Sequence, residues 1–470
     1  MTTTATTHRA LPGPRGLPVI GGRAGLLTLF GNPFGHLRRL YATYGDMVAL
    51  AAGDPSYVVA FGPRLNQQLL AHADVFENSA GPFFARLPKD TALGRLLVNN
   101  LPVMNGAPHR QQRRRMQPSF HTQQIAAYHR DMVALTERML ARLQPGAELE
   151  LLAEMKRLTQ HIAVTTLFGM DNEAELDRVG ALLKRAIDLS QSPLALLAPY
   201  NVVGLPFHRA NRMAEQLERY IRTVAERKRT QPDARDVLAT LVRARDEDGS
   251  VLSDDALIGN AFTLFVAGHE TTSNALTWTV FLLDQHPQIL ADLVDELQGV
   301  LGGRAPALED FARLPLLEGV IKESLRMLPP APIGMRVAAV PCELGGYALP
   351  RGATVIFSEF VTHRIPELYE HPDRFNPRRW ETLHPSPYEY LPFAAGPHMC
   401  IGWSFAMQEL RVVLAMLLQR YRLALVPDQT VVPGIAMRPA HGIQVRVHQQ
   451  DRQFVATPVR GTIHKLVELP

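Results

Sequence analysis

A ten-residue stretch from Phe393 to Gly402 places one cysteine in a turn of Gly, Pro and small residues, directly before a predicted helix. Apolar residues after Cys400 recur three and four positions apart up to Tyr421, which is typical of one face of an amphipathic helix. A thiol at a helix N-terminus lies near unpaired N–H groups and the positive end of the helix dipole, so we expect a lowered pKa and a metal-binding thiolate. Gly396 and Gly402 have no side chain, so we expect the backbone there to approach a flat ligand closely.

The bulk composition excludes several classes of protein. The chain has 470 residues, and 49 Lys and Arg against 45 Asp and Glu give a formal net charge of +4, too balanced to indicate nucleic acid as a partner. Two cysteines exclude a disulfide framework and a Cys-rich zinc site, and they favour a reducing, cytoplasmic setting. Length alone would suggest about three domains, but no Gly/Ser run, charge block or repeat marks a linker.

The first thirty residues form a Pro- and Gly-rich segment without a membrane anchor. Glycines and an arginine interrupt its apolar run, so we expect no bilayer-spanning helix there. A helix over Pro33–Tyr44 is predicted next, followed by two strands, Asp46–Ala51 and Tyr57–Phe61, that could form a hairpin. Two further strands are predicted at Leu423–Val426 and Ile443–Val447.

Residues 77–105 are rich in Gly, Pro and Asn and predict a loop region. Phe83 and Phe84 in this loop could close over a substrate, although an ordinary surface loop fits the same residues. From about 122 to 230 the pattern predicts successive amphipathic helices, broken by a Pro-punctuated apolar stretch at 191–200. That stretch fits either a mobile lid or core packing.

A cluster of basic residues opens a helix after Asn105. His109 and Arg113 are four positions apart and share one face, and Arg110 and Arg114 share the next face round. Without further context, such a run is a solvated face.

A long apolar helix is predicted from Ser253, as the N-cap, to His286, with Pro287 ending it. Glu270 and Thr271 lie at its centre, where a charge argues against a membrane span. A buried acid beside hydroxyl groups is a poor choice for stability alone, and Thr side chains can bond back to the preceding turn and open the helix.

Two patterns farther on are weak in isolation. Glu323 and Arg326 lie at i and i+3 of one helix, which most often means a surface ion pair. Arg374 follows in the sequence His-Pro-Asp-Arg-Phe, and Cys342 lies in a strand-like segment to which we assign no ligand role.

Together, Phe-x-x-Gly-x-His-x-Cys-x-Gly at 393–402, Ala-Gly-His-Glu-Thr-Thr at 267–272, Glu-x-x-Arg at 323–326 and His-x-x-x-Arg at 109–113 resemble the cytochrome P-450 family. The resemblance implies a mainly α fold with small β-sheets, in which haem b (iron protoporphyrin IX) lies between a long oxygen-activating helix and the helix after the cysteine loop. It also implies one haem domain over residues 1–470, with 451–470 as an extension of unknown role.

The resemblance assigns roles residue by residue. Cys400 would be the axial ligand of haem iron, and Glu270 and Thr271 would relay protons. The cofactor-binding residues would be His109, Arg113, Ala267, Gly268, Arg336, Phe393, Gly396, His398, Ile401 and Gly402. Position 398 is His where many members have Arg, so its contact with a haem propionate would be less bidentate. A structural network would comprise Glu323, Arg326 and Arg374. Candidates for the substrate pocket are Phe83, Phe84, Phe265, Ala267, Thr272 and Ile333.

The activity implied is that of a monooxygenase, which inserts one atom of O2 into a lipophilic small molecule such as a fatty acid, terpene, steroid or polyketide. Electrons would come from a separate ferredoxin or flavodoxin-type protein that docks near Arg110 and Arg114, and a bacterial, soluble monomer without a stable membrane anchor is expected. Two alternatives to a monooxygenase would also bind haem. One is a peroxide-using haem-thiolate enzyme, against which Glu270 and Thr271 argue, and the other is a non-catalytic haem sensor or electron carrier. A helical protein without haem is the third.

Overall fold

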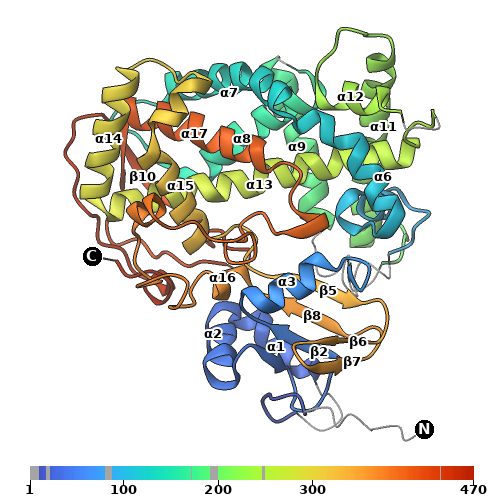
Figure 1. The fold of residues 1–470 in the computed structure, drawn as a ribbon. Coiled ribbons are helices and arrows are strands. Elements are labelled where there is room, and N and C mark those ends of the chain that lie inside the picture. Colours follow the sequence, from blue (N-terminus) through green and yellow to red (C-terminus); the bar gives the residue numbers. More distant parts are fainter. Residues whose placement is uncertain are drawn as a thin grey trace, which may run out of the picture.

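The computed structural model describes residues 10–16, 22–79, 87–170, 172–190, 199–245, 249–434 and 436–469. A large helical body carries a smaller part at one end, where α1, α2 and α3 lie with most of the strands (Figure 1). The helices in the described residues are α1 (Gly22–Gly31), α2 (Pro33–Tyr44), α3 (Pro63–Ala71), α5 (Ala92–Val98), α6 (Gly106–Met116), α7 (Thr122–Arg142), α8 (Leu151–Phe168), α9 (Glu173–Ser190), α11 (Pro206–Arg229), α12 (Val237–Arg243), α13 (Asp254–Gln285), α14 (Pro287–Leu301), α15 (Pro315–Met327), α16 (Glu359–Thr362) and α17 (Trp403–Arg420).

The strands form small sheets. They are β1 (Met47–Ala49), β2 (Tyr57–Ala60), β3 (Phe76–Asn78), β4 (Glu148–Glu150), β5 (Gly334–Ala338), β6 (Cys342–Leu344), β7 (Tyr347–Leu349), β8 (Thr354–Phe357), β9 (Tyr421–Leu425) and β10 (Gln444–Gln449). One sheet has the order β1-β2-β8-β5-β3, in which β2 and β8 are parallel and the other pairs antiparallel. The predicted hairpin is therefore confirmed as β1 and β2, and the two later strands pair as β9 and β10.

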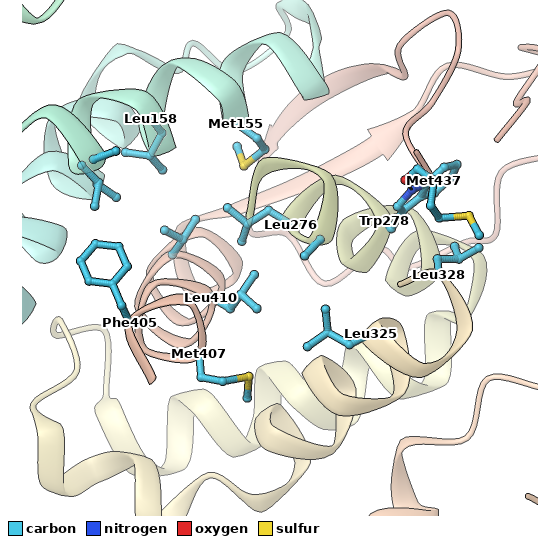
Figure 2. Packing of buried hydrophobic residues seen from close by; sticks show 14 of the residues in the cluster. Met155, Leu158, Leu276, Trp278, Leu325, Leu328, Phe405, Met407, Leu410 and Met437 are labelled. Carbon is cyan, nitrogen blue, oxygen red and sulfur yellow. Dashed lines mark hydrogen bonds between the residues drawn. The ribbon is translucent and has the colours of Figure 1, made fainter. Parts of the chain in front are cut away.

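Helix α13 confirms the predicted long helix at both ends. Oγ of Ser253 accepts a hydrogen bond from the backbone N–H of Ala256 at 3.2 Å, and the helix ends before Pro287. An α-helix that is apolar on all sides has to be buried on all sides. Figure 2 shows Leu276 of α13 among Met155 and Leu158 of α8, Leu325 of α15 and Leu410 of α17. These packed helices hold the centre of α13 in a fixed position.

The region 77–105 differs from the predicted loop, because it contains helix α5. Thr91 caps this helix by accepting a hydrogen bond from the N–H of Gly94 at 3.1 Å. Leu93 and Leu96 are buried in the main core, so tertiary packing outweighs the Gly- and Asn-rich composition. Phe83 and Phe84 lie outside the described residues, as does most of the stretch 191–200.

The described end of the chain, residues 451–469, runs back along the helical body. The carbonyl of Thr457 accepts a hydrogen bond from the side chain of Gln285 at 2.7 Å, and the N–H of Glu468 donates to the carbonyl of Asp373 at 2.8 Å. Ile463 is fully buried, so this segment is part of the packed fold. Among the helices described, none combines the length and apolar character required to cross a bilayer.

Candidate active site

A cavity of about 300 Å³ lies between α13 and the loop that leads into α17. Both the cysteine loop and the centre of α13 contribute to its wall. The predicted site residues on this wall are Ala267, Gly268, Thr271, Thr272, Phe393, His398, Cys400, Ile401 and Gly402. Sequence segments more than a hundred residues apart are therefore brought to one cavity, as the motifs predicted.

Cys400 is accessible from the cavity, yet it lies deep in the protein. Its backbone N–H donates to the carbonyl of Phe393 at 2.8 Å, which closes the loop. Burial raises the pKa of the Cys400 thiol, against the opposing effects of the Gly402 N–H and the charge of Arg113. The expected lowering of this pKa is thus wrong for the protein alone, because desolvation outweighs the helix N-terminus.

The two glycines of the loop have different roles. A Cβ on Gly402 would meet only the Phe120 ring, at 3.9 Å, so the cavity side of this residue is open. Gly396 has φ +71, and a Cβ there would lie 2.1 Å from the carbonyl oxygen of Leu70. The close approach expected at Gly396 is therefore to the end of α3 and not to a ligand. On the opposite wall, a Cβ on Gly268 would meet nothing within 4 Å.

Cationic and imidazole side chains gather at the side of the cavity near β5. The rings of His109 and His398 lie against each other, with centroids 3.9 Å apart and planes tilted by 35°. Burial, with the nearby charges of His109, Arg336 and Arg113, lowers the pKa of His398 to about 3. Arg336 is buried, and burial lowers its pKa to about 10 against the attraction of Glu359. Arg113 donates to the carbonyl of Met399 at 2.7 Å, directly before the cysteine.

The two predicted proton-relay residues face different sides of α13. Thr271 lines the cavity, and its hydroxyl donates to the carbonyl of Ala267 at 2.7 Å. The Glu270 carboxylate lies 3.4 Å from Nζ of Lys156 on α8 and is about one-third exposed. The pair therefore places a partly exposed carboxylate and a cavity-facing hydroxyl on adjacent residues of one helix.

The predicted structural network is built differently from the expectation. Glu323 and Arg326 are fully buried and form two hydrogen bonds of 2.9 Å. The third side chain is Arg379, in the 3₁₀ helix η4 (Pro377–Glu381), whose Nε donates to Glu323 at 2.9 Å. Arg374 enters the network only through its main-chain carbonyl, 3.4 Å from the Arg326 guanidinium, and its side chain is exposed. The third side chain is therefore Arg379 and not Arg374, because the Arg379 side chain is 9% exposed and paired with Glu323 whereas the Arg374 side chain is exposed.

Two of the proposed substrate-pocket residues lie elsewhere. Phe265 is fully buried in the core and packs on the ring of His269 at 4.5 Å, so the neighbouring Leu264 lines the cavity instead. Ile333 packs against the core, and Pro330 and Ala331 occupy the cavity wall. Both predictions chose a residue one to three positions away from the residues that line the cavity. The periodicity of a single sequence does not determine which residues of a short segment face a given side.

The residues present fit an iron porphyrin. The Cys400 thiol stands at one wall and an open glycine at the other, and the charge of buried Arg336 acts on the cavity-lining His398, so a cation is available there for carboxylate groups. Nε2 of His398 is buried and has no hydrogen-bond partner within the described residues. A buried donor or acceptor without a partner points to a missing group, and a propionate would supply it.

Sequence reasoning missed four side chains at or near this site. Lys156 lies 114 residues from its partner Glu270, and no spacing rule links them. Glu359 lines the cavity, and burial raises its pKa to about 8. Arg379 and Trp380 both donate to Glu323, and the neighbouring Arg-Arg-Trp sequence was the available signal for them.

Comparison with known proteins points to the same family as the sequence motifs. A family model described as cytochrome P450 matches residues 11–444. The cyclooctat-9-en-7-ol 5-monooxygenase of Streptomyces melanosporofaciens is 35% identical over 430 residues, covering 89% of this chain and 90% of the relative. The pentalenene oxygenase of Streptomyces avermitilis is 31% identical over 443 residues, covering 92% and 96%. The solved structure of retinoic acid-bound cyanobacterial CYP120A1 superposes with a TM-score of 0.80 at 25% identity, covering 94% of this chain and all of that one. The predicted fold class, mainly α with small β-sheets, is confirmed.

Proposed function

Because this chain belongs to the cytochrome P450 family, we propose that it oxidises a lipophilic molecule with a hydrocarbon skeleton, using electrons from a separate donor protein. The chain is a haem-thiolate monooxygenase. The proposal rests on one observation above all: Cys400 and the Ala267–Thr272 segment of α13 line the same cavity.

Haem b is the cofactor that we infer. When bound, it supplies the reductive activation of O2 and the transfer of one oxygen atom to carbon, with the other atom leaving as water. Cys400 would hold the iron, and Phe393 and Ile401 would shield the sulfur from water. His398, Arg336 and His109 would neutralise the propionates, while Arg113 fixes the loop through the Met399 carbonyl.

Proton delivery is the task that we assign to the centre of α13. Glu270 takes a proton at its solvent-facing carboxylate, and the Thr271 hydroxyl passes it into the cavity. For this transfer the carboxylate has to leave Lys156, and an ion pair exposed to this degree is weak enough to open. Gly268 leaves space beside the hydroxyl for water and O2.

Thr271→Ala tests this assignment. The variant should keep the haem and still consume reducing equivalents, but release hydrogen peroxide in place of organic product. Cys400→Ser should lose the red-shifted Soret band of the ferrous carbonyl complex. If Thr271→Ala forms product with unchanged yield per electron, the relay is wrong, and if peroxide drives product formation as well as O2 with donor proteins does, the enzyme is a peroxygenase.

The substrate class rests on the wall of the cavity and on the relatives. On the α13 wall, opposite Cys400, Leu264 and Ala275 contribute apolar surface to the cavity. Two relatives are named for cyclooctat-9-en-7-ol and pentalenene, which by name are an unsaturated alcohol and an alkene. We infer a terpene-like substrate for this chain, and a panel of terpenes, steroids and fatty acids should give substrate-induced Soret shifts with the terpenes alone.

An acidic electron donor would dock on the exposed face of α6 that carries Arg110 and Arg114. Replacing both by Glu should slow reduction by a ferredoxin at least about tenfold at low ionic strength and much less at high salt. Arg351→Glu, in an exposed turn beyond β7, is the matched control and should leave the rate unchanged. We also infer a monomer with one haem domain over residues 1–470. We infer a cytoplasmic location as well, since the two cysteines suit a reducing compartment.

A further inference from the structure

The end of strand β3 contacts the cysteine loop through Asn78. Its Nδ2 lies 2.8 Å from Nδ1 of His398 and 2.9 Å from the carbonyl oxygen of Pro102. A carbonyl oxygen only accepts hydrogen bonds, so the atom that faces Pro102 has to be the amide NH2 group and not the amide oxygen. The second hydrogen of that group points to His398. The imidazole Nδ1 is therefore an acceptor without a hydrogen of its own.

This contact fixes the tautomer of His398. A neutral imidazole that accepts at Nδ1 carries its hydrogen on Nε2. Nε2 is buried, has no partner within the described part of the chain, and belongs to a side chain on the cavity wall. The His109 ring lies against it, with centroids 3.9 Å apart and planes tilted by 35°, and so restricts rotation of the imidazole. A single N–H donor is thus held in one direction at the cofactor site.

We propose that Asn78 is a positioning residue of the cofactor site: its amide group holds the His398 imidazole in the tautomer that directs an Nε2–H donor to a haem propionate. The proposal rests on the proposed function, in which His398 contacts that propionate. Arg336 is the cross-strand neighbour of Asn78 in the β3–β5 pair, so the same strand pairing places both donors. Arginine at position 398 would need no such partner, because each nitrogen of its guanidinium carries hydrogen.

A structural role for Asn78 can be separated from this positioning role. The side chain of Asn105 exchanges two hydrogen bonds with the main chain of Asn78, at 2.8 and 3.0 Å, and thereby ties β3 to the segment before α6. No hydrogen bond joins Asn105 to His398 in the described residues. Asn105→Ala therefore loosens the same strand end without changing the imidazole, and it is the matched control for Asn78→Leu.

The test measures the rate at which the ferric enzyme loses haem to an excess of apomyoglobin, together with thermal unfolding. Asn78→Leu should speed haem loss about tenfold, as expected for one lost hydrogen bond to a charged acceptor. In the His398→Arg background, the same Asn78→Leu change should alter the rate less than twofold. Asn105→Ala should also stay within twofold. Selectively 15N-labelled histidine in the ferrous carbonyl complex should show His398 protonated at Nε2 in the parent and a changed tautomer signal in Asn78→Leu.

The following results would contradict the proposed role of Asn78. Equal acceleration by Asn78→Leu and Asn105→Ala, or an Asn78 effect that persists in the His398→Arg background, would assign Asn78 to strand tethering alone. A His398→Phe variant tests the propionate contact of His398 separately from the role of Asn78. If it loses haem at the parental rate, the propionate contact of the proposed function fails and the role of Asn78 falls with it. If it loses haem rapidly while Asn78→Leu does not, only the role of Asn78 fails.

Discussion

Removing Arg379 should destabilise the protein, whereas removing Arg374 should not. Arg379 donates from Nε to Glu323 at 2.9 Å and from a terminal nitrogen to the carbonyl of Glu370 at 2.9 Å. A hydrogen bond to a charged group contributes about 1.5–3 kcal/mol, and the side chain is only 9% exposed, so little water can replace it. Because Arg326 still neutralises Glu323 in Arg379→Met, no unpaired buried charge is created. We expect a loss of about 3 kcal/mol.

The expected shift in melting temperature follows from the size of the chain. Unfolding 470 residues carries an entropy of about 1 kcal/mol per degree, so about 3 kcal/mol lowers the melting temperature by about 3 °C. Arg374→Met keeps the main-chain carbonyl that Arg326 and Arg379 both contact, so we expect less than about 0.5 kcal/mol.

The assay is thermal unfolding of both variants and the parent, each loaded with haem, followed by circular dichroism and Soret absorbance. The two variants remove the same charge and nearly the same volume, so net charge does not distinguish them. A melting temperature of Arg374→Met that falls as far as that of Arg379→Met would refute the assignment of the third network residue to η4.

Three further variants test other parts of the site. Burial raises the pKa of Glu359 from 4.5 to about 8, so its contribution to stability is present below pH 4.5 and lost as the pH rises to 8, by at most about 1.4 kcal/mol per pH unit. Glu359→Gln should remove this pH dependence of the melting temperature between pH 5 and pH 8, and an unchanged pH dependence would exclude Glu359 as its source. Gly268→Ala should keep or raise the melting temperature by helix propensity, about 1 kcal/mol, while its methyl group weakens substrate-induced Soret shifts; a fall in stability would contradict the open space there. His363→Phe leaves the N–H of Leu391 and the carbonyl of Arg326 without partners, which should destabilise the protein by about 1–3 kcal/mol each. A melting temperature within about 1 °C of the parent would contradict the role of His363 in joining these two segments.

Local patterns predicted those elements whose own sequence decides their structure. The long helix α13 has a capping Ser253, a terminating Pro287 and an apolar interior, and all three signals agree with its bounds. The hairpin β1–β2 likewise depends on neighbouring residues. Helix α5 was missed because its stability comes from burial of Leu93 and Leu96 against helices far along the chain.

The candidate site was predictable where a motif fixes the geometry and not where partners come from distant segments. Cys400 and Thr271 lie on the cavity wall as their motifs indicate. Asn78 and Lys156 contact the site across 320 and 114 positions of sequence, and nothing in their own neighbourhoods marks them. The thiol pKa was misjudged for a related reason, since the helix N-terminus is visible in the sequence whereas the depth of burial is not.

The buried network is connected to the cysteine loop by one histidine. Nδ1 of His363 lies 3.1 Å from the carbonyl oxygen of Arg326, which can only accept, so Nδ1 carries the hydrogen. Nε2 then accepts from the N–H of Leu391 at 2.8 Å, two residues before Phe393. Burial and the charge of Arg326 lower the pKa of His363 to about 3, which keeps the ring neutral and this pattern of donor and acceptor unchanged at physiological pH. A fully buried ion pair is weak evidence for stability in itself, but here the Arg326 guanidinium also donates to the carbonyl of His363 at 2.8 Å and so anchors the histidine that holds the segment before Cys400. This connection gives the charged network a reason to be buried that its own free energy does not supply.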